Sequence, residues 1–220
     1  MFLGGRLYVV GSLVAVELTA RVAVELVLAT RNPGKVAELR ALLADVPVTL
    51  VTADDLDAPP AVEEDAETLR GNARKKALAF HAHAGRPALA DDTGLEVEAL
   101  DGAPGVHTAR FAGPRADAAA NNTHLLSQLD GASTRRARFR TVIALAEGDD
   151  RVQYFEGTCS GRIAEAPRGA EGFGYDPLFI PEGEERTFAE MPAAEKNSIS
   201  HRRRALEAFT TYLRNRLGDL

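Results

Sequence analysis

The run from Ala88 to Gly94 constrains this chain most, because an apolar strand leads into two adjacent aspartates, Asp91 and Asp92, and then into a predicted glycine turn. Adjacent carboxylates repel each other, so local folding alone gives no reason for the pair. A divalent cation does give one, because Mg²⁺ takes hard oxygen ligands, usually one or two carboxylates completed by waters and phosphates. A solvated turn rich in Asp and Gly is the alternative for this run taken alone. Other parts of the chain decide between the two.

Length and charge limit the classes to which the chain can belong. Its 220 residues suit one domain or a tightly fused pair of lobes. A net charge of −6 argues against a nucleic-acid-binding protein, which would normally be basic. The local basic cluster at residues 135–140 is predicted to lie on a solvated strand edge. The single cysteine, Cys159, excludes an intrachain disulfide and fits a reducing compartment, so we expect a cytoplasmic protein.

The first 23 residues are predicted to be an N-terminal extension of uncertain relevance. Their apolar stretch, Leu7 to Leu18, is too short to span a bilayer and is interrupted by Glu17. With Arg6 as its only preceding cation, it also makes a poor signal peptide, and we expect no membrane partner. The domain pattern begins at Val24, so residues 24–220 are expected to form one domain.

Hydrophobic periodicity predicts strands that alternate with helices, together with one hairpin. The expected strands cover residues 24–29, 87–91, 95–97, 136–146, 151–163 and 178–180, and the expected helices cover 36–43, 67–84, 116–129 and 200–217. This order indicates an α/β fold with a mixed sheet.

The turn between the first strand and the first helix could bind an anion. A helix N-terminus presents unpaired N–H groups and the positive end of the helix dipole. The candidate binding residues here are Thr30, Arg31, Asn32, Pro33, Gly34 and Lys35, with Asn32 as the predicted N-cap and Pro33 at the first helical position. A capped helix with a surface lysine explains this turn equally well.

A second candidate part lies around the start of the next helix. Asn72 and Lys76 are one helical turn apart and share a face that overlaps an apolar stripe. Lys76 therefore either reaches solvent or points into a cleft that holds an anion. Glu64 precedes this helix, where an acid commonly interacts with the helix dipole, but it could instead share a cation with Asp92.

Two further strings lie near the C-terminal end. Gly172 to Pro177 places glycines on both sides of Phe173, which would expose its ring for stacking, although a β-turn with core aromatics is the alternative. Glu195 to Arg202 is predicted to begin the last helix, with Ser200 as its cap. The cationic side chain of Arg202 in its first turn opposes the helix dipole, which suggests that this end of the helix recognises something outside it.

These four motifs together resemble the inosine triphosphate pyrophosphatase family, also called the Ham1-like or non-standard purine nucleoside-triphosphate pyrophosphatases. The resemblance runs in order from Val24 to about Leu217. It implies hydrolysis of dITP, ITP and XTP to the monophosphate and pyrophosphate, dependence on Mg²⁺, and a homodimer. It also implies an elongated mixed β-sheet with flanking helices, forming two lobes around a substrate cleft as in Maf/Ham1-like proteins.

The resemblance also implies residue roles. Asp92 would be the catalytic base and, with Glu64, a metal ligand. The implied substrate-binding residues are Thr30, Arg31, Asn32, Pro33, Gly34, Lys35, Lys76, Thr93, Phe173, Gly174, Tyr175, Asp176, Lys196, His201 and Arg202. The pair His201–Arg202 would read the oxygen edge of the purine. The chain departs from the family pattern at Ala66, Leu69 and Thr93, where Gly, Phe and Ser are usual.

Two alternative functions stay open at this point. One is a related Maf-like pyrophosphatase that acts on modified pyrimidine nucleotides, although the strings at Phe173 and His201 favour purines. The other is a catalytically silent nucleotide-binding module. Retention of Asp92 and Glu64 argues against that module, because binding alone needs no carboxylate beside a triphosphate.

Overall fold

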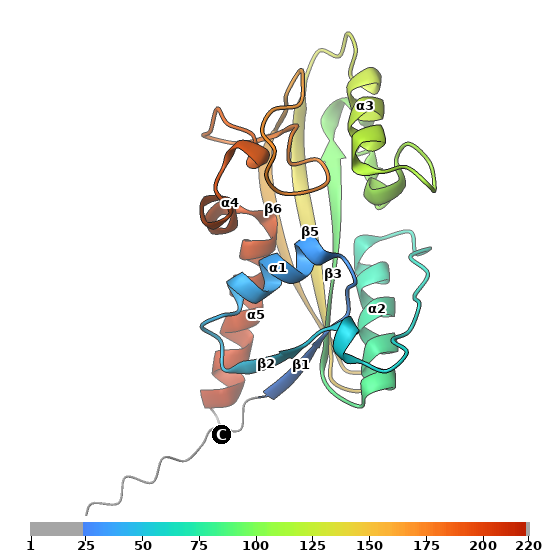
Figure 1. The fold of residues 1–220 in the computed structure, drawn as a ribbon, viewed down its shortest axis with the longest axis vertical. Coiled ribbons are helices and arrows are strands. Elements are labelled where there is room, and N and C mark those ends of the chain that lie inside the picture. Colours follow the sequence, from blue (N-terminus) through green and yellow to red (C-terminus); the bar gives the residue numbers. More distant parts are fainter. Residues whose placement is uncertain (1–23, 219–220) are drawn as a thin grey trace, which may run out of the picture.

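The computed structural model describes residues 24–218 as an elongated α/β molecule (Figure 1). Its strands are β1 (Val24–Leu28), β2 (Val48–Val51), β3 (Ala88–Val97), β4 (Pro104–Gly105), β5 (Arg136–Ala146), β6 (Val152–Ile163) and β7 (Phe179–Pro181). Its α-helices are α1 (Pro33–Leu42), α2 (Leu69–Ala84), α3 (Ala118–Gln128), α4 (Ala193–Ile199) and α5 (His201–Gly218). Short 3₁₀ helices lie between them, among them η3 (Thr108–Arg110). The predicted N-terminal extension, residues 1–23, lies outside the part of the chain that the structure describes.

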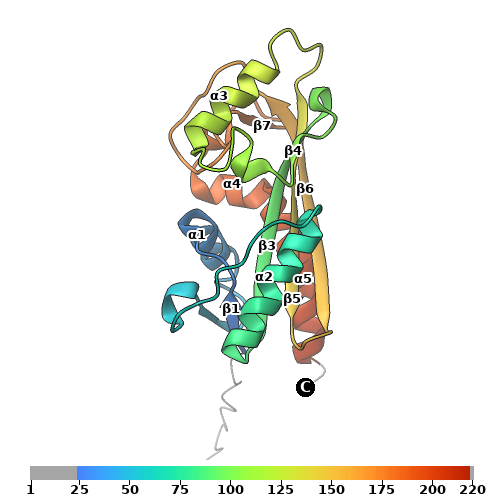
Figure 2. The same cartoon turned by 90° about the vertical axis from the view of Figure 1, so that its right-hand side faces the viewer.

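All seven strands form one mixed sheet in the order β2-β1-β3-β5-β6-β7, with β4 paired to β3. β1 is parallel to β2 and to β3, whereas the pairs β3–β5, β5–β6 and β6–β7 are antiparallel. The molecule has two lobes (Figure 2). The lower lobe contains β1, β2, α1 and α2, and the upper lobe contains α3, β4 and β7. The long strands β3, β5 and β6 run through both lobes. The predicted α/β class and mixed sheet are therefore confirmed.

Three apolar clusters form the cores of the two lobes. In the lower lobe, α2 packs on one face of the sheet through Ala73, Ala77 and Phe80. Helices α1 and α5 cover the opposite face, with Leu39 and Phe209 among their core residues. A third cluster fills the upper lobe and joins α3 to the far ends of β3, β5 and β6. Figures 1 and 2 show α3 at one end of the molecule, and α2 and α5 toward the other.

One edge of β3 lacks a strand partner where the two lobes meet. β1 pairs with β3 only at Ala88 and Leu89, and β4 pairs with it only at Leu95 and Glu96. The backbone between these pairings therefore faces α1 and α2 instead of another strand. The carbonyl oxygen of Asp91, in this gap, accepts hydrogen bonds from Lys76 Nζ at 2.8 Å and Lys35 Nζ at 3.4 Å.

Two predictions about strands are wrong. The expected strands 87–91 and 95–97 form one continuous strand, and Gly94 lies inside it instead of in a turn. Its Cα hydrogen faces Gly105, whose carbonyl oxygen would lie only 2.7 Å from an added Cβ. The basic cluster at 135–140 is not at a sheet edge, because β5 lies between β3 and β6. Arg138 and Arg140 instead form ion pairs with Glu96 on the solvent side of this central strand.

Helix boundaries also differ from the prediction at the C-terminal end. Ser200 caps the last helix as predicted, and its hydroxyl accepts a hydrogen bond from the Arg203 N–H at 3.2 Å. Lys196, however, lies on a separate helix, α4, that precedes this cap. Pro192 immediately before α4 and the extended backbone of Ser200 after it delimit the short helix. Within the described residues, no helix is long and apolar enough to cross a membrane.

Candidate active site

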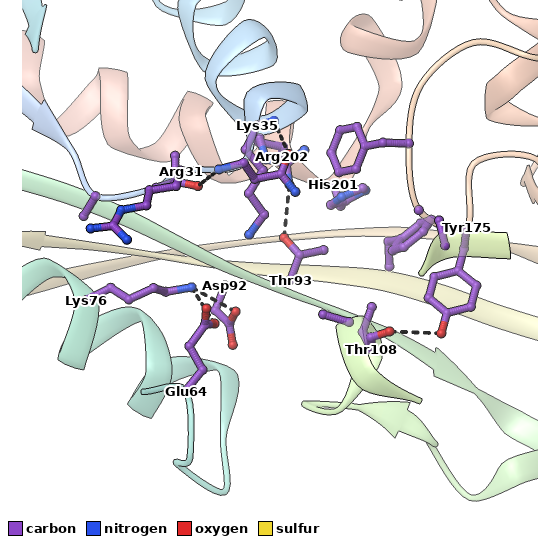
Figure 3. A pocket seen from close by; sticks show the side chains of 18 of the residues that line it. Arg31, Lys35, Glu64, Lys76, Asp92, Thr93, Thr108, Tyr175, His201 and Arg202 are labelled. Atoms are coloured by element: carbon purple, nitrogen blue, oxygen red, sulfur yellow. Dashed lines mark hydrogen bonds and ion pairs between the residues drawn. The ribbon is translucent and has the colours of Figure 1, made fainter. Parts of the chain in front are cut away.

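A cavity of about 640 Å³ lies between the two lobes and collects residues from both. Fifteen of the seventeen predicted site residues line it: Thr30, Arg31, Asn32, Lys35, Glu64, Lys76, Asp92, Thr93, Phe173, Gly174, Tyr175, Asp176, Lys196, His201 and Arg202. Figure 3 shows how the labelled side chains among them converge from the turn before α1, β3, α2, α5 and the loop around Tyr175. The other two, Pro33 and Gly34, lie beside the cavity in the first turn of α1.

The two adjacent aspartates point to opposite faces of the sheet, as the alternation of side chains along a strand requires. Asp91 faces α1 and α5, where it meets Lys35 and Arg202. Asp92 faces α2, where it meets Lys76 and Asn72. The sequence neighbours therefore belong to two different electrostatic environments, and their repulsion is smaller than the sequence suggests.

Asp92 belongs to a carboxylate pair that holds one lysine. Lys76 Nζ lies 2.8 Å from Glu64 Oε2 and 3.2 Å from Asp92 Oδ1 (Figure 3). Asn72 Nδ2 donates to the other Asp92 oxygen at 3.3 Å. Burial, reinforced by the charge of Glu64, raises the pKa of Asp92 to about 6 although Lys76 and Lys35 oppose the shift. Burial alone would raise the pKa of Glu64, but the charge and hydrogen bond of Lys76, together with Asp92 and Lys35, lower it overall.

Asp91 begins a chain of ion pairs in which the charges alternate. It pairs with Lys35 and Arg202, Arg202 also pairs with Glu38, and Glu38 with Lys196, which finally pairs with Asp176. Burial alone would raise the pKa of Asp91, but Lys35, Arg202 and Lys76 hold it well below its usual range. Three cations and three carboxylates thus neutralise one another from the first turn of α1 to the loop that contains Phe173.

The first turn of α1 has the predicted cap. Asn32 Oδ1 accepts a hydrogen bond from the Lys35 N–H at 3.1 Å, and Pro33 occupies the start of the helix. Thr30 Oγ1 accepts from the Asn32 N–H at 3.2 Å. Arg31 donates to the carbonyl of Pro59 at 2.6 Å, which ties this turn to the loop before α2. The turn is therefore rigid and directs its polar groups toward the cavity.

Phe173 lies against this turn from the opposite lobe. Asp176 Oδ2 accepts from the Phe173 N–H at 2.8 Å, and Gly172 and Gly174 have positive φ values of 76° and 64°. A Cβ added to Gly34 would lie 2.5 Å from the Phe173 ring. The ring can therefore occupy its present position only because residue 34 has no side chain.

His201, which the family resemblance assigns to reading the oxygen edge of the purine, lies in the protein interior. Its ring is buried and stacks on Phe139, with centroids 4.6 Å apart and an interplanar angle of 23°. Burial, together with the charges of Arg202 and Lys196, lowers its pKa well below the ordinary value, so the imidazole is neutral. A neutral ring can donate only one N–H, and its Nδ1 has no hydrogen-bond partner in the described structure.

Sequence reasoning missed Glu38, Thr108 and Asn121. Glu38 looks like an ordinary helix residue, but it is buried, and its carboxylate binds both Lys196 and Arg202. Thr108 and Asn121 line the cavity from the upper lobe. The position of Glu38, three residues after Lys35 on α1, could have suggested that it shares the face of that lysine.

This arrangement can bind a polyanion and activate water beside it. Lys35, Arg202 and the N-terminus of α1 lie on one side of the cavity, whereas the Glu64–Asp92 pair lies with Lys76 on the other (Figure 3). A carboxylate whose pKa is near 6 can act as a general base near neutral pH. An aromatic ring at the opposite end offers a surface for a flat ligand.

The sequence is similar to those of known proteins of one family. The model of the Ham1 family matches residues 26–212. The dITP/XTP pyrophosphatase of Desulforamulus reducens is 51% identical over 195 residues, covering 88% of this chain and 96% of that protein. The enzyme of the same name from Geobacter sulfurreducens is 47% identical, covering 86% and 96%.

A solved structure shares the same fold. The HAM1 protein of Coxiella burnetii superposes with a TM-score of 0.80 at 41% identity, covering 87% of this chain and 99% of that one. The family match, the sequence identity and the shared fold each extend over most of this chain, which belongs to the Ham1 family.

Proposed function

We propose that this protein hydrolyses non-canonical purine nucleoside triphosphates (dITP, ITP, XTP and dXTP) to the nucleoside monophosphate and pyrophosphate, and so cleanses the nucleotide pool. The observation that carries the proposal is the shared cavity, in which the Glu64–Asp92 pair, the N-terminus of α1 and Phe173 all face one space. The name of two of its relatives, dITP/XTP pyrophosphatase, supports the same reaction.

Mg²⁺ is the proposed cofactor, with Glu64 and Asp92 as its protein ligands. Among residues 24–218 no cluster of three or more His, Cys, Asp or Glu could hold a metal ion alone. Two carboxylates fit Mg²⁺ nevertheless, because this ion commonly completes its shell with waters and substrate phosphates. The raised pKa of Asp92 is consistent with this, since the mutual repulsion of Asp92 and Glu64 would be relieved by a cation. When bound, the ion would neutralise charge that develops on the phosphates.

The chain's own residues would perform the remaining steps. The first turn of α1 and Lys35 would hold the phosphate chain, while Lys76 keeps Asp92 oriented. Asp92 would accept a proton from a water molecule while the oxygen of that water attacks the α-phosphorus of the nucleotide. The new P–O bond forms as the bond from the α-phosphorus to the bridging oxygen breaks, so pyrophosphate leaves with that electron pair.

Selectivity would depend on hydrogen-bond donors at the base end of the cavity. Phe173 would stack on the purine, and Lys196, His201 and Arg202 lie around it. Donors suit the 6-oxo group of hypoxanthine or xanthine. The 6-amino group of adenine would oppose donor to donor and leave buried polar groups unpaired.

One assay tests the reaction and separates the alternatives. Pyrophosphate release is measured from ITP, dITP, XTP, GTP, ATP and modified pyrimidine triphosphates, each with Mg²⁺ and with EDTA. We expect Mg²⁺-dependent release, fastest from ITP, dITP and XTP. Preference for modified pyrimidines would instead favour a Maf-like enzyme, and nucleotide binding without release would favour a silent module.

We further propose that the protein acts as a homodimer in the cytoplasm, where its substrates occur. The absence of a disulfide-capable cysteine pair supports the compartment. Light scattering coupled to size-exclusion chromatography tests the dimer, and a mass of one protomer would contradict it.

A further inference from the structure

Hydrogen bonds connect the 3₁₀ helix η3 to three of the elements around the cavity. The hydroxyl of Tyr175 donates to the carbonyl of Thr108 at 3.0 Å (Figure 3), and Asn121 Nδ2 donates to that of Ala109 at 3.1 Å. Thr108 Oγ1 accepts from the Leu95 N–H at 2.8 Å and donates to Gly105. η3 is thus fixed to β3, to α3 and to the loop that contains Phe173.

From this fixed helix, one side chain reaches the other lobe. A terminal nitrogen of Arg110 donates to the backbone carbonyl of Glu64 at 2.9 Å, in a part-buried contact. Glu64 lies in the irregular segment between η1 (Ala53–Asp55) and α2, where no strand or helix holds its backbone. The next backbone anchor is the Ala66 N–H, which donates to Asn72 Oδ1 at 2.9 Å. Arg110 is therefore the upper-lobe contact that holds the backbone of Glu64.

We propose that Arg110 is a positioning residue that presets the Glu64 carboxylate for a divalent cation. The inference rests on the proposed function, in which Glu64 and Asp92 share that cation. Arg110 does not line the cavity, so it acts through Glu64 and not on the substrate. Its guanidinium carries a charge, and its hydrogen bond to a part-buried carbonyl is stronger than one between neutral groups.

Glu64 needs a positioning residue because its chain segment is less constrained than the strand that carries Asp92. Glu64 is on a loop, and loops move more than the elements that they connect. Asp92 is fixed on a central strand, so the separation of the two carboxylates depends on the Glu64 segment alone. Residues that orient metal ligands typically contribute about 10–100-fold to metal affinity or activity. Arg110 supplies this orientation from the upper lobe, and therefore links the position of that lobe to the cation site.

Two variants and a matched control test the proposal in the full-length protein. Arg110→Met keeps much of the aliphatic length and removes the donors, whereas Arg110→Lys retains a charge and one possible contact. Arg115→Met, at an exposed arginine five residues further along, is the control. Circular dichroism and thermal unfolding establish that each variant is folded.

The first readout is Mn²⁺ binding to the nucleotide-free protein, followed by electron paramagnetic resonance. We expect Arg110→Met to raise the Kd for Mn²⁺ about tenfold, Arg110→Lys to lie between it and the wild type, and Arg115→Met to leave it unchanged. The second readout is the Mg²⁺ concentration that half-activates pyrophosphate release from ITP, which should rise by the same factor. ITP binding measured in EDTA should not change, because Arg110 is not among the residues that line the cavity.

Unchanged Mn²⁺ affinity in folded Arg110→Met and Arg110→Lys would overturn the proposal. A wild-type protein that binds no Mn²⁺ without nucleotide would overturn it too, because the site would not be preset. Failure of the proposed function is distinguishable from both outcomes: the wild type would then release no pyrophosphate from ITP, while the Mn²⁺ measurement would still report on Arg110.

Discussion

Arg202 binds the carboxylate of Asp91 through two nitrogens, Nε at 3.1 Å and a terminal nitrogen at 3.0 Å, although the residues are 111 positions apart. The same guanidinium also donates to Glu38 and to Thr93 Oγ1. Most of its donors are therefore engaged within the protein, and its side chain is 1% exposed. Arg202 holds α5 against β3 as well as facing the cavity, which any test of base recognition must take into account.

Arg202→Lys should reduce selectivity while keeping the charge. Lysine cannot reproduce the planar contacts of a guanidinium, so a donor directed at the base should be lost or displaced. We expect kcat/KM for ITP to fall about tenfold or more, with little change for ATP. The measurement is kcat/KM for both substrates at saturating Mg²⁺. An equal fall for the two would assign Arg202 to structure or phosphate binding.

Glu38→Gln should destabilise the protein, because Lys196 and Arg202 would lose the carboxylate between them. All three side chains are buried, and removing one member of a buried ion pair typically costs about 3–5 kcal/mol. Urea unfolding measures the loss. The control is Glu195→Gln, which removes a carboxylate that pairs with Arg186 at the surface and should cost at most about 1 kcal/mol. Similar effects of the two changes would contradict the role of Glu38.

Gly34→Ala should weaken substrate binding without weakening the fold. Alanine is favoured over glycine in a helix by about 0.5–1 kcal/mol, but its methyl group would displace the Phe173 ring. Loss of about 1 kcal/mol of base stacking corresponds to an increase of about fivefold in KM for ITP. Gly148→Ala is the control, because a Cβ there meets only Arg151, at 3.9 Å. Wild-type KM in Gly34→Ala would show that the ring does not stack on substrate.

Asp92→Asn should nearly abolish turnover in a protein that still folds and binds nucleotide. Asparagine keeps the size of the side chain but cannot accept the proton from water, and loss of a general base typically costs about 10²–10⁴-fold. Single-turnover hydrolysis of ITP measures the effect, with Asp45→Asn at an exposed position as the control. Near-normal activity in Asp92→Asn would refute the assignment of the base.

The same variant should stabilise the metal-free protein at high pH. The folded-state pKa of Asp92 is about 6, above its ordinary value of 3.8, so the folded state binds the proton more tightly. Its contribution to stability is fully present below pH 3.8 and is lost as the pH rises through about 6. Asn carries no charge to bury, so the gain over wild type should reach up to about 3 kcal/mol at pH 8 and be small near pH 4. Urea unfolding in EDTA at both values tests this; a gain independent of pH would contradict it.

Local patterns in the sequence determined the fold class, most element positions and the Asn32 cap. These features depend on residues close together in the chain, through hydrophobic periodicity and capping chemistry. The site residues and their roles came from four motifs and their resemblance to a family, and the structure brings fifteen of the seventeen to one cavity. What each of them does there stays a prediction.

Only the tertiary structure decided how the charges are paired. Nothing in the sequence near Glu38 indicates that it lies between Lys196 and Arg202, 158 and 164 residues away. The opposite directions of Asp91 and Asp92 likewise required β3 to continue past Asp91, because successive side chains alternate between the faces of a sheet only along extended backbone. Continuity of that strand depends on pairing with β5 from Ala88 to Val97, and such long-range pairing leaves no local signature in the chain. The sequence by itself therefore determined which groups this protein contains, whereas long-range strand pairing and burial decided which of them meet.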